Sequence, residues 1–336
     1  METIMLTGED VKKLLTMDEA LEAVETAFRE KGLGRVQMPP KSYIFFKRYH
    51  GDLRPMPAYI EALNKAGVKI VGAYPENPKR FNLPLVMGTM ILVDPDTGHP
   101  FSIMDACWLT AMRTGAGGGV AAKYLSRKNA RTLGIIGAGM QARTQFMAID
   151  MVRSIERVYV NDIIPEKAQK YAEEMGKSCG ADFIPVEDPS KAVRGVDVLV
   201  TATPTTKPIV RNEWVEPGLH INAIGADAPG KQELDFEVLK RAKIVVDDWE
   251  QSSHAGEINV ALSRGIITKD HVYGELGEVV AGKKPGRTSD DEITIFDSTG
   301  LSIQDVATAT KVYENALKKD LGLKVDLCEY VIRDVG

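Results

Sequence analysis

One stretch constrains this chain more than any other. From Leu133 to Ile136 a short apolar run leads directly into the glycine-rich turn Gly137-Ala138-Gly139-Met140-Gln141-Ala142, and the residues that follow have helical composition. Strand, glycine turn and helix in this order are the G-x-G-x-x-A form of the dinucleotide-binding fingerprint. Gly137 is expected to make the tight turn, Gly139 to let the backbone approach a pyrophosphate, and Ala142 to let the helix pack on the strand. We therefore predict that the residues of this turn bind the cofactor.

A glycine-rich turn alone is weak evidence for dinucleotide binding. A second sign is an acidic residue at the end of the next strand, which would bind the ribose. The β-rich run Arg157 to Asn161 is closed by Asp162, about 20 residues after the glycines, where a carboxylate can accept hydrogen bonds from both ribose hydroxyls. No arginine adjoins Asp162 in the sequence, so its carboxylate is expected to repel a 2′-phosphate and to favour NAD over NADP. The alternative is that Asp162 is an ordinary turn residue at a strand end.

Composition narrows the class of protein. The 336 residues are 44% hydrophobic and 26% charged, which is ordinary globular composition and long enough for two domains. The net charge of −5 provides no basic surface for nucleic acid or an anionic membrane. The sequence lacks an apolar run of roughly 20 residues and a signal-peptide start, so we expect a cytoplasmic protein. The cysteines, Cys107, Cys179 and Cys328, have no zinc spacing and are expected to be reduced thiols without a metal.

The first third of the chain changes from helical to β-rich patterning. From Met17 onward apolar residues fall on one helical face as far as Gly32, so the opening is predicted to be α-helical. Short β-rich runs separated by turn residues follow without intervening helices, which predicts an antiparallel sheet. These runs are Lys41 to Arg48, Asp52 to Glu61, Gly67 to Tyr74 and Leu85 to Val93. The segment from Asp105 to Leu125 returns to helix.

From Arg131 onward strands and helices alternate, as a parallel doubly wound sheet requires. A long amphipathic helix from about Leu301 to Lys319 then leaves this sheet, and the apolar segment Lys324 to Val331 is expected to rejoin the first domain. We predict an α/β protein: a Rossmann NAD-binding domain at 129–301 and a discontinuous α+β substrate-binding domain at 1–128 and 302–336.

Polar residues follow three strands of the predicted Rossmann sheet. In open α/β sheets, ligands bind just outside the carboxyl ends of the strands. The polar residues are Thr201 and Thr203, then Asp227 within Gly225 to Gly230, and finally Ser298, Thr299 and Gly300. We predict that the threonines and the 298–300 segment contact the cofactor. Small neighbours leave room for a substrate at Asp227, although an aspartate before a turn is as often structural.

Charged residues in the first half also qualify as site residues. Lys69 lies in an apolar strand, where a lysine has either a salt partner or a lowered pKa that suits acid–base chemistry on an amine or imine. Arg113 on a helix near the cofactor domain can bind a carboxylate through its guanidinium, or form a structural ion pair. Arg54 lies on a predicted strand. The histidines are dispersed, and His254 near Glu257 is the pair with a possible role.

Together these residues resemble the ornithine cyclodeaminase/mu-crystallin family over almost the whole chain. The segments that carry the resemblance are Ala66 to Val71, Pro75 to Pro78, Met104 to Ala106, Arg113 to Gly115, Ile136 to Gly139, Asn222 to Asp227, Lys231 to Asp235 and Phe296 to Gly300. Within the family the sequence is similar to archaeal alanine dehydrogenases through Gly51 to Arg54, Trp214 to Glu216 and Glu257 to Val260.

The resemblance implies a homodimer that pairs through the sheets of its N-terminal domains, with NAD on the Rossmann domain and the active site between domains. It implies that Lys69 is the active-site lysine, that Asp227 contacts the substrate amine and that Arg113 binds the substrate carboxylate. Family cyclodeaminases tend to carry a glutamate where this chain has Arg54, and a cation there would repel the distal amine of ornithine. Arg54 is instead expected to bind the carboxylate of a small amino acid.

We therefore expect an NAD-dependent amino-acid dehydrogenase that interconverts L-alanine with pyruvate and ammonia by hydride transfer and imine hydrolysis. Its partners would be a small amino acid or 2-oxo acid and a second copy of the chain. One alternative is an ornithine cyclodeaminase or a reductase of cyclic imines such as pyrroline-2-carboxylate, which shares the oxidation step. Another is a mu-crystallin-like binding protein that holds a ligand without turnover.

Overall fold

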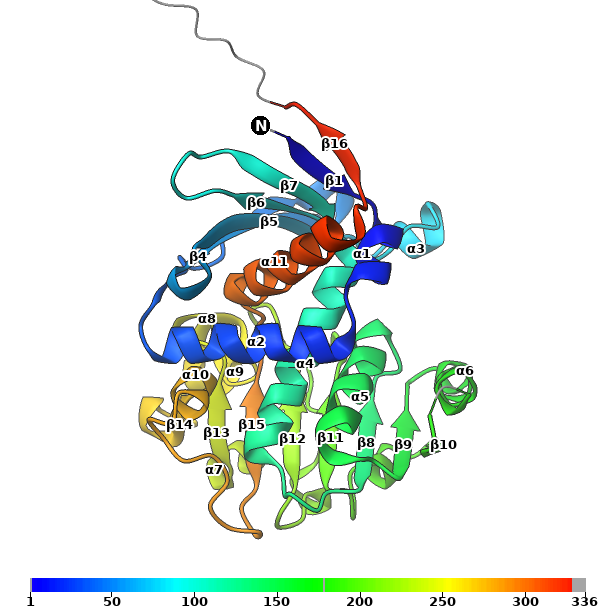
Figure 1. Cartoon of the computed structure of the whole chain (residues 1–336). Coiled ribbons are helices and arrows are strands. Elements are labelled where there is room, and N and C mark those ends of the chain that lie inside the picture. Colours follow the sequence, from blue (N-terminus) through cyan, green and yellow to red (C-terminus); the bar gives the residue numbers. More distant parts are fainter. Residues whose placement is uncertain (1, 178, 328–336) are drawn as a thin grey trace, which may run out of the picture. The chain divides into compact units, whose positions relative to one another are not determined.

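The computed structural model describes residues 2–177 and 179–327 and divides into two compact units (Figure 1). Unit 1 comprises Met1–Ala23, Arg35–Thr110 and Ser302–Gly336, and unit 2 comprises Val24–Gly34 and Ala111–Leu301. The division falls within two helices, α2 (Met17–Gly32) and α4 (Cys107–Leu125).

Unit 1 is built on a mainly antiparallel sheet. Its strands are β1 (Thr3–Leu6), β2 (Val36–Gln37), β3 (Ile44–Phe46), β4 (Gly51–Ile60), β5 (Lys65–Ala73), β6 (Val86–Val93), β7 (Pro100–Asp105) and β16 (Leu323–Val325). The order is β16-β1-β7-β6-β5-β4-β2, with β3 paired to β4. β1 and β7 run parallel, whereas β4, β5, β6 and β7 form antiparallel neighbours. The helices are α1 (Gly8–Leu14), α3 (Asn77–Arg80) and α11 (Ser302–Lys319).

Helix α11 packs on β4, β5 and β6 and covers one face of this sheet (Figure 1). Met56, Lys69 and Met90 are opposite one another on adjacent strands and are buried. Because side chains alternate along a strand, Val68 and Ile70 point to the other face, where Ile70 is exposed. The sheet therefore has one covered face and one open apolar face.

Unit 2 contains the predicted doubly wound sheet, which is parallel throughout its described pairs. Its strands are β8 (Thr132–Ile136), β9 (Arg157–Asn161), β10 (Asp182–Pro185), β11 (Val198–Thr201), β12 (His220–Ala223), β13 (Lys243–Val246), β14 (Val272–Glu275) and β15 (Thr294–Asp297). They lie in the order β10-β9-β8-β11-β12-β15-β13-β14. The helices of this part of the chain are α5 (Met140–Arg153), α6 (Pro165–Gly176), α7 (Phe236–Arg241), α8 (Trp249–Ala255), α9 (Asn259–Ser263) and α10 (Leu276–Val280).

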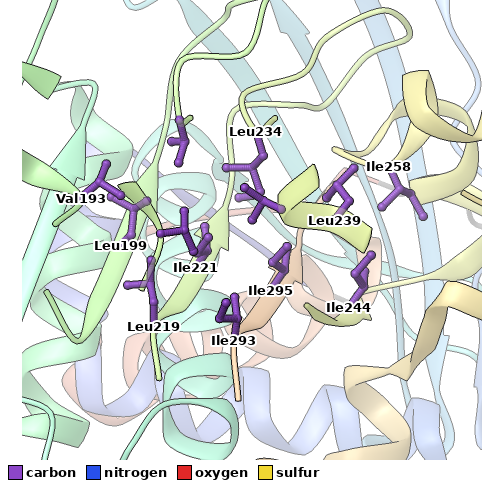
Figure 2. Packing of buried hydrophobic residues seen from close by; sticks show 14 of the residues in the cluster. Val193, Leu199, Leu219, Ile221, Leu234, Leu239, Ile244, Ile258, Ile293 and Ile295 are labelled. Atoms are coloured by element: carbon purple, nitrogen blue, oxygen red, sulfur yellow. The ribbon is translucent and has the colours of Figure 1, made fainter. Parts of the chain in front are cut away.

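Both faces of the parallel sheet are buried, which explains why its strands are continuous apolar runs rather than alternating ones. Leu199 and Ile221 contribute to one hydrophobic cluster with Ile295 and with Leu239 of α7 (Figure 2). The neighbouring residues Val198 and Val200, together with Leu133, Phe146 and Tyr171, form the cluster on the other face. The ends of β8, β11, β12 and β15 are thereby fixed in one row.

The predicted fold class is confirmed; the structure adds one strand, returns the C-terminal segment to unit 1 as predicted, and divides the chain at a different position. The chain opens with strand β1, which extends the sheet beside β7, before the helices begin. β16 rejoins unit 1 by pairing with β1, whereas residues 328–331 of the predicted last segment, with Cys328, lie outside the described residues. The domain boundary was predicted at 128/129, but the structure divides the chain at 110/111 and also assigns residues 24–34 to unit 2.

Close backbone packing explains the different boundary. A Cβ at Gly115 of α4 would lie 2.4 Å from the carbonyl oxygen of Thr144 on α5, so these helices touch through their backbones. In the same way a Cβ at Gly32 would lie 1.9 Å from the carbonyl oxygen of Gly277 on α10. Lys31 also forms ion pairs with Asp248 and Glu275. Both segments are therefore part of the Rossmann unit.

Candidate active site

The glycine turn has the geometry that a bound dinucleotide requires. Gly137 follows β8 with φ of +99°, which favours glycine, and a Cβ there would lie 2.7 Å from the carbonyl oxygen of Ala202 after β11. Gly139 is the N-cap of α5, and a Cβ at this position would meet nothing within 4 Å. Ala142 is fully buried. The open space at Gly139 and the N-terminus of a long helix together fit a pyrophosphate.

Asp162 connects the end of β9 to this turn. One carboxylate oxygen accepts a hydrogen bond from the Ala138 N–H at 2.9 Å, and the other accepts from the Ile164 N–H at 2.9 Å. Each oxygen has a second lone pair that can accept from a ribose hydroxyl. An arginine also reaches the turn: Arg143 donates to the carbonyl oxygens of Ala138 and Gly139, and Glu174 pairs with its guanidinium.

The hydroxyls predicted after β11 face a buried carboxylate. Thr201 and Thr203 each donate to Glu233 at 2.7 Å, and the same carboxylate accepts from the backbone N–H of Thr203 and Gly225. Thr201 is fully buried. These hydroxyls organise the loops after β11 and β12, and their contact with a cofactor stays a prediction.

The loop after β15 is organised in the same way. Asp247 at the end of β13 accepts from the backbone N–H of Thr299 at 2.6 Å and of Gly300 at 2.7 Å, and also from the Thr299 hydroxyl. The Ser298 hydroxyl lies 3.5 Å from the same carboxylate. Sequence reasoning singled out the 298–300 segment but missed Asp247 and Glu233, which hold these loops.

Four acidic side chains lie buried along the strand ends: Glu233, Asp247, Glu257 and Asp297. Burial raises the pKa of Glu233, although the Thr201 and Thr203 hydroxyls favour its charged form. Burial and the charge of Glu233 raise the pKa of Glu257 well above its usual range. Burial also raises the pKa of Asp297, with a contribution from Asp247. Burial among like charges therefore raises the pKa of three of these carboxyls, Glu233, Glu257 and Asp297.

Asp227 lies in the loop after β12. Its carboxylate accepts from the Lys231 ammonium at 2.5 Å, and the two side chains are 36% and 25% exposed. An exposed pair of this kind contributes little stability, because water solvates both charges. In this structure the Asp227 carboxylate therefore already binds an ammonium group, that of Lys231.

Arg113 lies on α4 and is 7% exposed. Its guanidinium packs against Gly300: a Cβ at Gly300, where φ is +78°, would lie 2.3 Å from Arg113 Nη1. The structure thus brings Arg113 together with the predicted 298–300 segment in unit 2. The carboxylate-binding role of Arg113 stays a prediction.

A chain of buried polar groups holds α4 in place. Gln145 of α5 donates to the carbonyl oxygen of Thr114, and its own amide oxygen accepts from Asn222. The Asn222 amide oxygen contacts His220 Nε2 at 3.0 Å, and His220 Nδ1 contacts the Thr294 hydroxyl at 2.9 Å. Burial lowers the pKa of His220 to about 3, so the ring is neutral. This chain ends one residue from Arg113.

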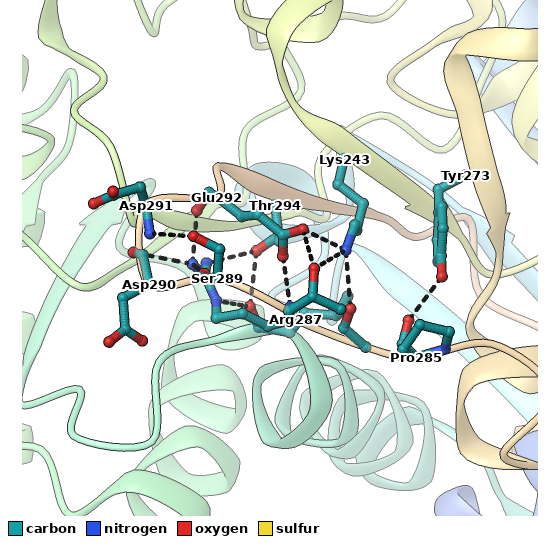
Figure 3. Close-up of polar contacts among 12 residues, drawn as sticks. Lys243, Tyr273, Pro285, Arg287, Ser289, Asp290, Asp291, Glu292 and Thr294 are labelled. Carbon is teal, nitrogen blue, oxygen red and sulfur yellow. Dashed lines mark hydrogen bonds and ion pairs between the residues drawn. The ribbon is translucent and has the colours of Figure 1, made fainter.

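Arg287 anchors the other end of the chain (Figure 3). It donates to Thr294 Oγ1 at 3.1 Å and to the carbonyl oxygens of Leu125 and Glu292, both at 2.7 Å. The Asn222 amide donates to Gly118 and Gln145, so its oxygen is the acceptor that faces His220 Nε2. A neutral His220 therefore carries its proton on Nε2, while the Thr294 hydroxyl donates to the Leu125 carbonyl oxygen at 2.9 Å.

In unit 1, Lys69 is fully buried and its Nζ lies 2.7 Å from the Asp305 carboxylate of α11. Of the two alternatives for a lysine in an apolar strand, the structure supplies the salt partner. Sequence reasoning missed Asp305. A signal was present, because Asp305 is the sole charged residue between Ser298 and Thr310.

Arg54 lies on the same face of the sheet as Lys69. Arg54 is opposite Val71 and Met56 is opposite Lys69, so the two basic residues are diagonal neighbours on β4 and β5. The Arg54 guanidinium pairs with Asp52 through two hydrogen bonds of 2.9 and 2.7 Å. Asp52 was missed as its partner. The pair is close to neutral, so Arg54 repels a second substrate ammonium less than a lone guanidinium would.

The pair His254 and Glu257 is not formed. The exposed His254 ring contacts the Glu250 carbonyl oxygen at 2.8 Å, whereas Glu257 accepts from the backbone of Glu233 and Leu234. Within residues 2–177 and 179–327 no cluster of His, Cys, Asp and Glu suits a metal ion, and none of the helices there is long and apolar enough to cross a membrane. Cys107 and Cys179 are free thiols.

Comparison with known proteins gives near-complete matches. The profile of the ornithine cyclodeaminase/mu-crystallin family matches residues 1–320. Alanine dehydrogenase of Archaeoglobus fulgidus is 55% identical over 97% of this chain and 98% of its own length. A solved archaeal alanine dehydrogenase dimer with bound NAD has 54% identity and a TM-score of 0.93, covering 97% of this chain and all of that one.

A second solved structure has the same TM-score and a lower sequence identity. The Δ1-pyrroline-2-carboxylate reductase of Thermococcus litoralis, in complex with NADH and L-proline, has 42% identity and a TM-score of 0.93. The match covers 96% of this chain and all of that one. These matches extend across both units and agree with the resemblance carried by the motifs. The chain belongs to the ornithine cyclodeaminase/mu-crystallin family.

Proposed function

We propose that this protein is an NAD-dependent amino-acid dehydrogenase that interconverts L-alanine with pyruvate and ammonia. The observation that carries the proposal is 55% identity over nearly the full length of an alanine dehydrogenase. The cofactor assignment is supported by the open turn at Gly139 and by Asp162, whose carboxylate ends β9 beside that turn. A similar structure is described with bound NAD.

The substrate roles are assigned residue by residue. Arg113 binds the substrate carboxylate, because a guanidinium offers two parallel donors to it. Asp227 binds the substrate ammonium in place of Lys231, which forms the same charge-assisted contact in this structure. Lys69 moves a proton at Nζ while water adds to the imine formed from the substrate. Asp305 holds the Lys69 side chain in place for this step. When bound, NAD accepts the hydride from the substrate α-carbon.

Arg54 has a supporting role in this proposal. Asp52 fixes the guanidinium through both of its oxygens, and the Tyr43 ring lies 5.2 Å from it. A guanidinium held in this way is oriented before substrate arrives, which reduces the entropy lost on binding a carboxylate. Arg54 therefore favours substrates with a carboxylate.

A second candidate function is reduction of Δ1-pyrroline-2-carboxylate to proline. It is favoured by one observation, the 42% identity and TM-score of 0.93 to a reductase of that substrate. The two functions share hydride transfer at a carbon bonded to nitrogen and differ in the imine that occupies the site. Incubation with NAD and a panel of amino acids, followed by the absorbance of reduced nicotinamide, tests the first. Incubation with NADH and pyrroline-2-carboxylate tests the second.

We also propose that the protein forms a homodimer through the open face of the unit 1 sheet. Val68 and Ile70 point away from α11, and Ile70 is 39% exposed. A hollow of about 330 Å³ on the same sheet is lined by Pro57, Tyr59 and Val68. An open apolar face is typical of a protein interface, and a similar structure is described as a dimer. Light scattering of the wild type and of Ile70→Lys tests this: a dimer is expected, and the variant should dissociate.

A further inference from the structure

The loop that carries Asp227 is held at its centre by one buried amide. Asn259, at the start of α9, is 7% exposed. Its Oδ1 accepts from the Gly230 N–H at 3.0 Å, and its Nδ2 donates to the Lys231 carbonyl oxygen at 2.9 Å. These contacts grip the tight turn that follows Asp227, in which the Lys231 N–H donates to Ala228 and Gly230 has φ of +83°. A single side chain therefore binds both a backbone N–H and a backbone carbonyl oxygen of this turn.

Buried carboxylates fix the two ends of the same loop. Glu233 accepts from the Gly225 N–H at 2.9 Å, and Glu257 accepts from the backbone N–H groups of Glu233 and Leu234 at 2.9 and 2.7 Å. Both carboxylates are buried in the core of unit 2. Asp227 lies between them, and the central contact to Asn259 determines where the turn sits.

Asn259 is itself fixed to the end of β15. Asp297 accepts from the N–H groups of Glu257 at 2.9 Å and Ile258 at 3.2 Å. A Cβ at Gly256 would lie 2.5 Å from the Asp297 carboxylate, so only glycine allows this approach. The Asn259 amide also donates to the Gly256 carbonyl oxygen at 2.5 Å. A continuous path thus leads from the strand end through residues 256–259 to the turn beside Asp227.

The chemistry of the contact requires an amide. Gly230 N–H needs an acceptor and the Lys231 carbonyl needs a donor, and an asparagine side chain supplies both from one short group. The Lys231–Asp227 ion pair cannot replace it, because both of its members lie on the same turn and move together. We propose that Asn259 is a positioning residue that sets the Asp227 carboxylate, and with it Lys231, for the amine of the substrate. This inference rests on the proposed role of Asp227.

The test is a double-mutant cycle with Asn259→Ala and Asp227→Asn. A displacement of about 1 Å of a reacting group can lower a rate by about 100-fold. We therefore expect Asn259→Ala to lower kcat for alanine by about 10- to 100-fold, with NADH affinity, measured by fluorescence titration, changed less than about twofold. In the Asp227→Asn background the same substitution should have almost no further effect on kcat, because Asn259 acts through Asp227.

Two further variants keep the test decisive. Asn259→Asp preserves the size of the side chain and the acceptor for the Gly230 N–H, but it loses the donors to the Lys231 and Gly256 carbonyl oxygens, and it should also lower kcat. Asn315→Ala in unit 1 removes a buried amide of the same type, which donates to Leu14 and Glu19, and should leave kcat unchanged.

The outcomes separate this inference from the proposed function. An unchanged kcat in Asn259→Ala and Asn259→Asp, or an equal fold-loss with and without the Asp227 carboxylate, overturns the positioning role. An unimpaired Asp227→Asn variant also overturns it, by removing the residue through which Asn259 would act. Wild-type protein that fails to oxidise alanine refutes the proposed function instead, and the cycle is then measured with the amino acid that is oxidised.

Discussion

The buried ion pair between Lys69 and Asp305 gives the sharpest prediction for stability. Both side chains are fully buried, and their N–O distance is 2.7 Å. Asp305→Asn keeps the shape of the side chain but leaves the Lys69 ammonium without this counter-charge. Removing one member of a buried pair typically costs about 3–5 kcal/mol, which multiplies the unfolding equilibrium constant by about 10² to 10³ or more. The pair also joins α11 to β5, so the loss should appear in the unfolding of unit 1.

The matched variants separate charge pairing from packing. Lys69→Met/Asp305→Leu replaces both charges with apolar groups, and we expect it to be neutral or more stable than wild type, because desolvation of both ions is avoided. Glu237→Gln breaks a pair with Lys240 at the same 2.7 Å, but those side chains are 58% and 43% exposed. That variant should lose less than about 1 kcal/mol.

Urea unfolding followed by circular dichroism measures these free energies at neutral pH. The reasoning predicts a large loss for Asp305→Asn and recovery in the double variant. A loss in Asp305→Asn no larger than in Glu237→Gln, or a double variant at least as unstable as Asp305→Asn, would refute the view that the two charges are coupled in a dry interior.

Three other predictions concern the cofactor site, the lysine and the buried histidine. Asp162→Ser should reduce the preference for NAD over NADP, measured as the ratio of kcat/KM values; an unchanged ratio would remove this carboxylate from the ribose site. Lys69→Ala should abolish turnover while NADH still binds by fluorescence titration, whereas joint loss of binding and folding would leave Lys69 a structural residue. His220 is neutral in the fold with its pKa lowered from 6.5 to about 3, so its contribution to stability is complete above pH 6.5 and is lost as pH falls toward 3. Wild type should lose up to about 1.4 kcal/mol per pH unit more than His220→Gln in this window, and parallel pH profiles would contradict it.

Local patterns in the sequence were enough to predict the alternating strands and helices of the Rossmann unit, except for the edge strands β10 and β14. A buried parallel strand is a continuous apolar run, and the turn from Gly137 to Ala142 follows such a run directly, so adjacent residues carry the information. The β-rich runs of unit 1 were located for the same reason. Strand β1 was missed because its partner β7 lies about a hundred residues away and only their pairing makes so short a segment a strand.

The partners of the site residues were not predictable in the same way. Asp305 pairs with Lys69 across 236 positions of sequence, and no periodicity links them. Glu233 and Asp247 bind the loops that carry Thr201 and Thr299, yet in sequence they are ordinary acids in polar segments. The hydroxyls of these loops were assigned to a cofactor because a strand-end position indicates a ligand; the structure shows that carboxylates of the core also require donors there.

The ion pair with Asp52 weakens the effect of Arg54 on substrate choice. As a lone guanidinium Arg54 would strongly disfavour ornithine, whose side chain ends in an ammonium group. Asp52 lies two residues earlier and points to the same face of β4, so the two form an ion pair at 2.7 Å. The repulsion is reduced accordingly, and discrimination against ornithine depends more on the space available for its side chain.

Product analysis with alanine and ornithine tests the central claim most directly. Purified protein is incubated with NAD and either amino acid, and NADH, pyruvate, ammonia and proline are quantified over the same interval. The account predicts that alanine yields pyruvate, ammonia and NADH in equal amounts and that ornithine yields little or no proline. Proline formed from ornithine at a rate equal to or above that of alanine oxidation would contradict it and assign the protein to the cyclodeaminases.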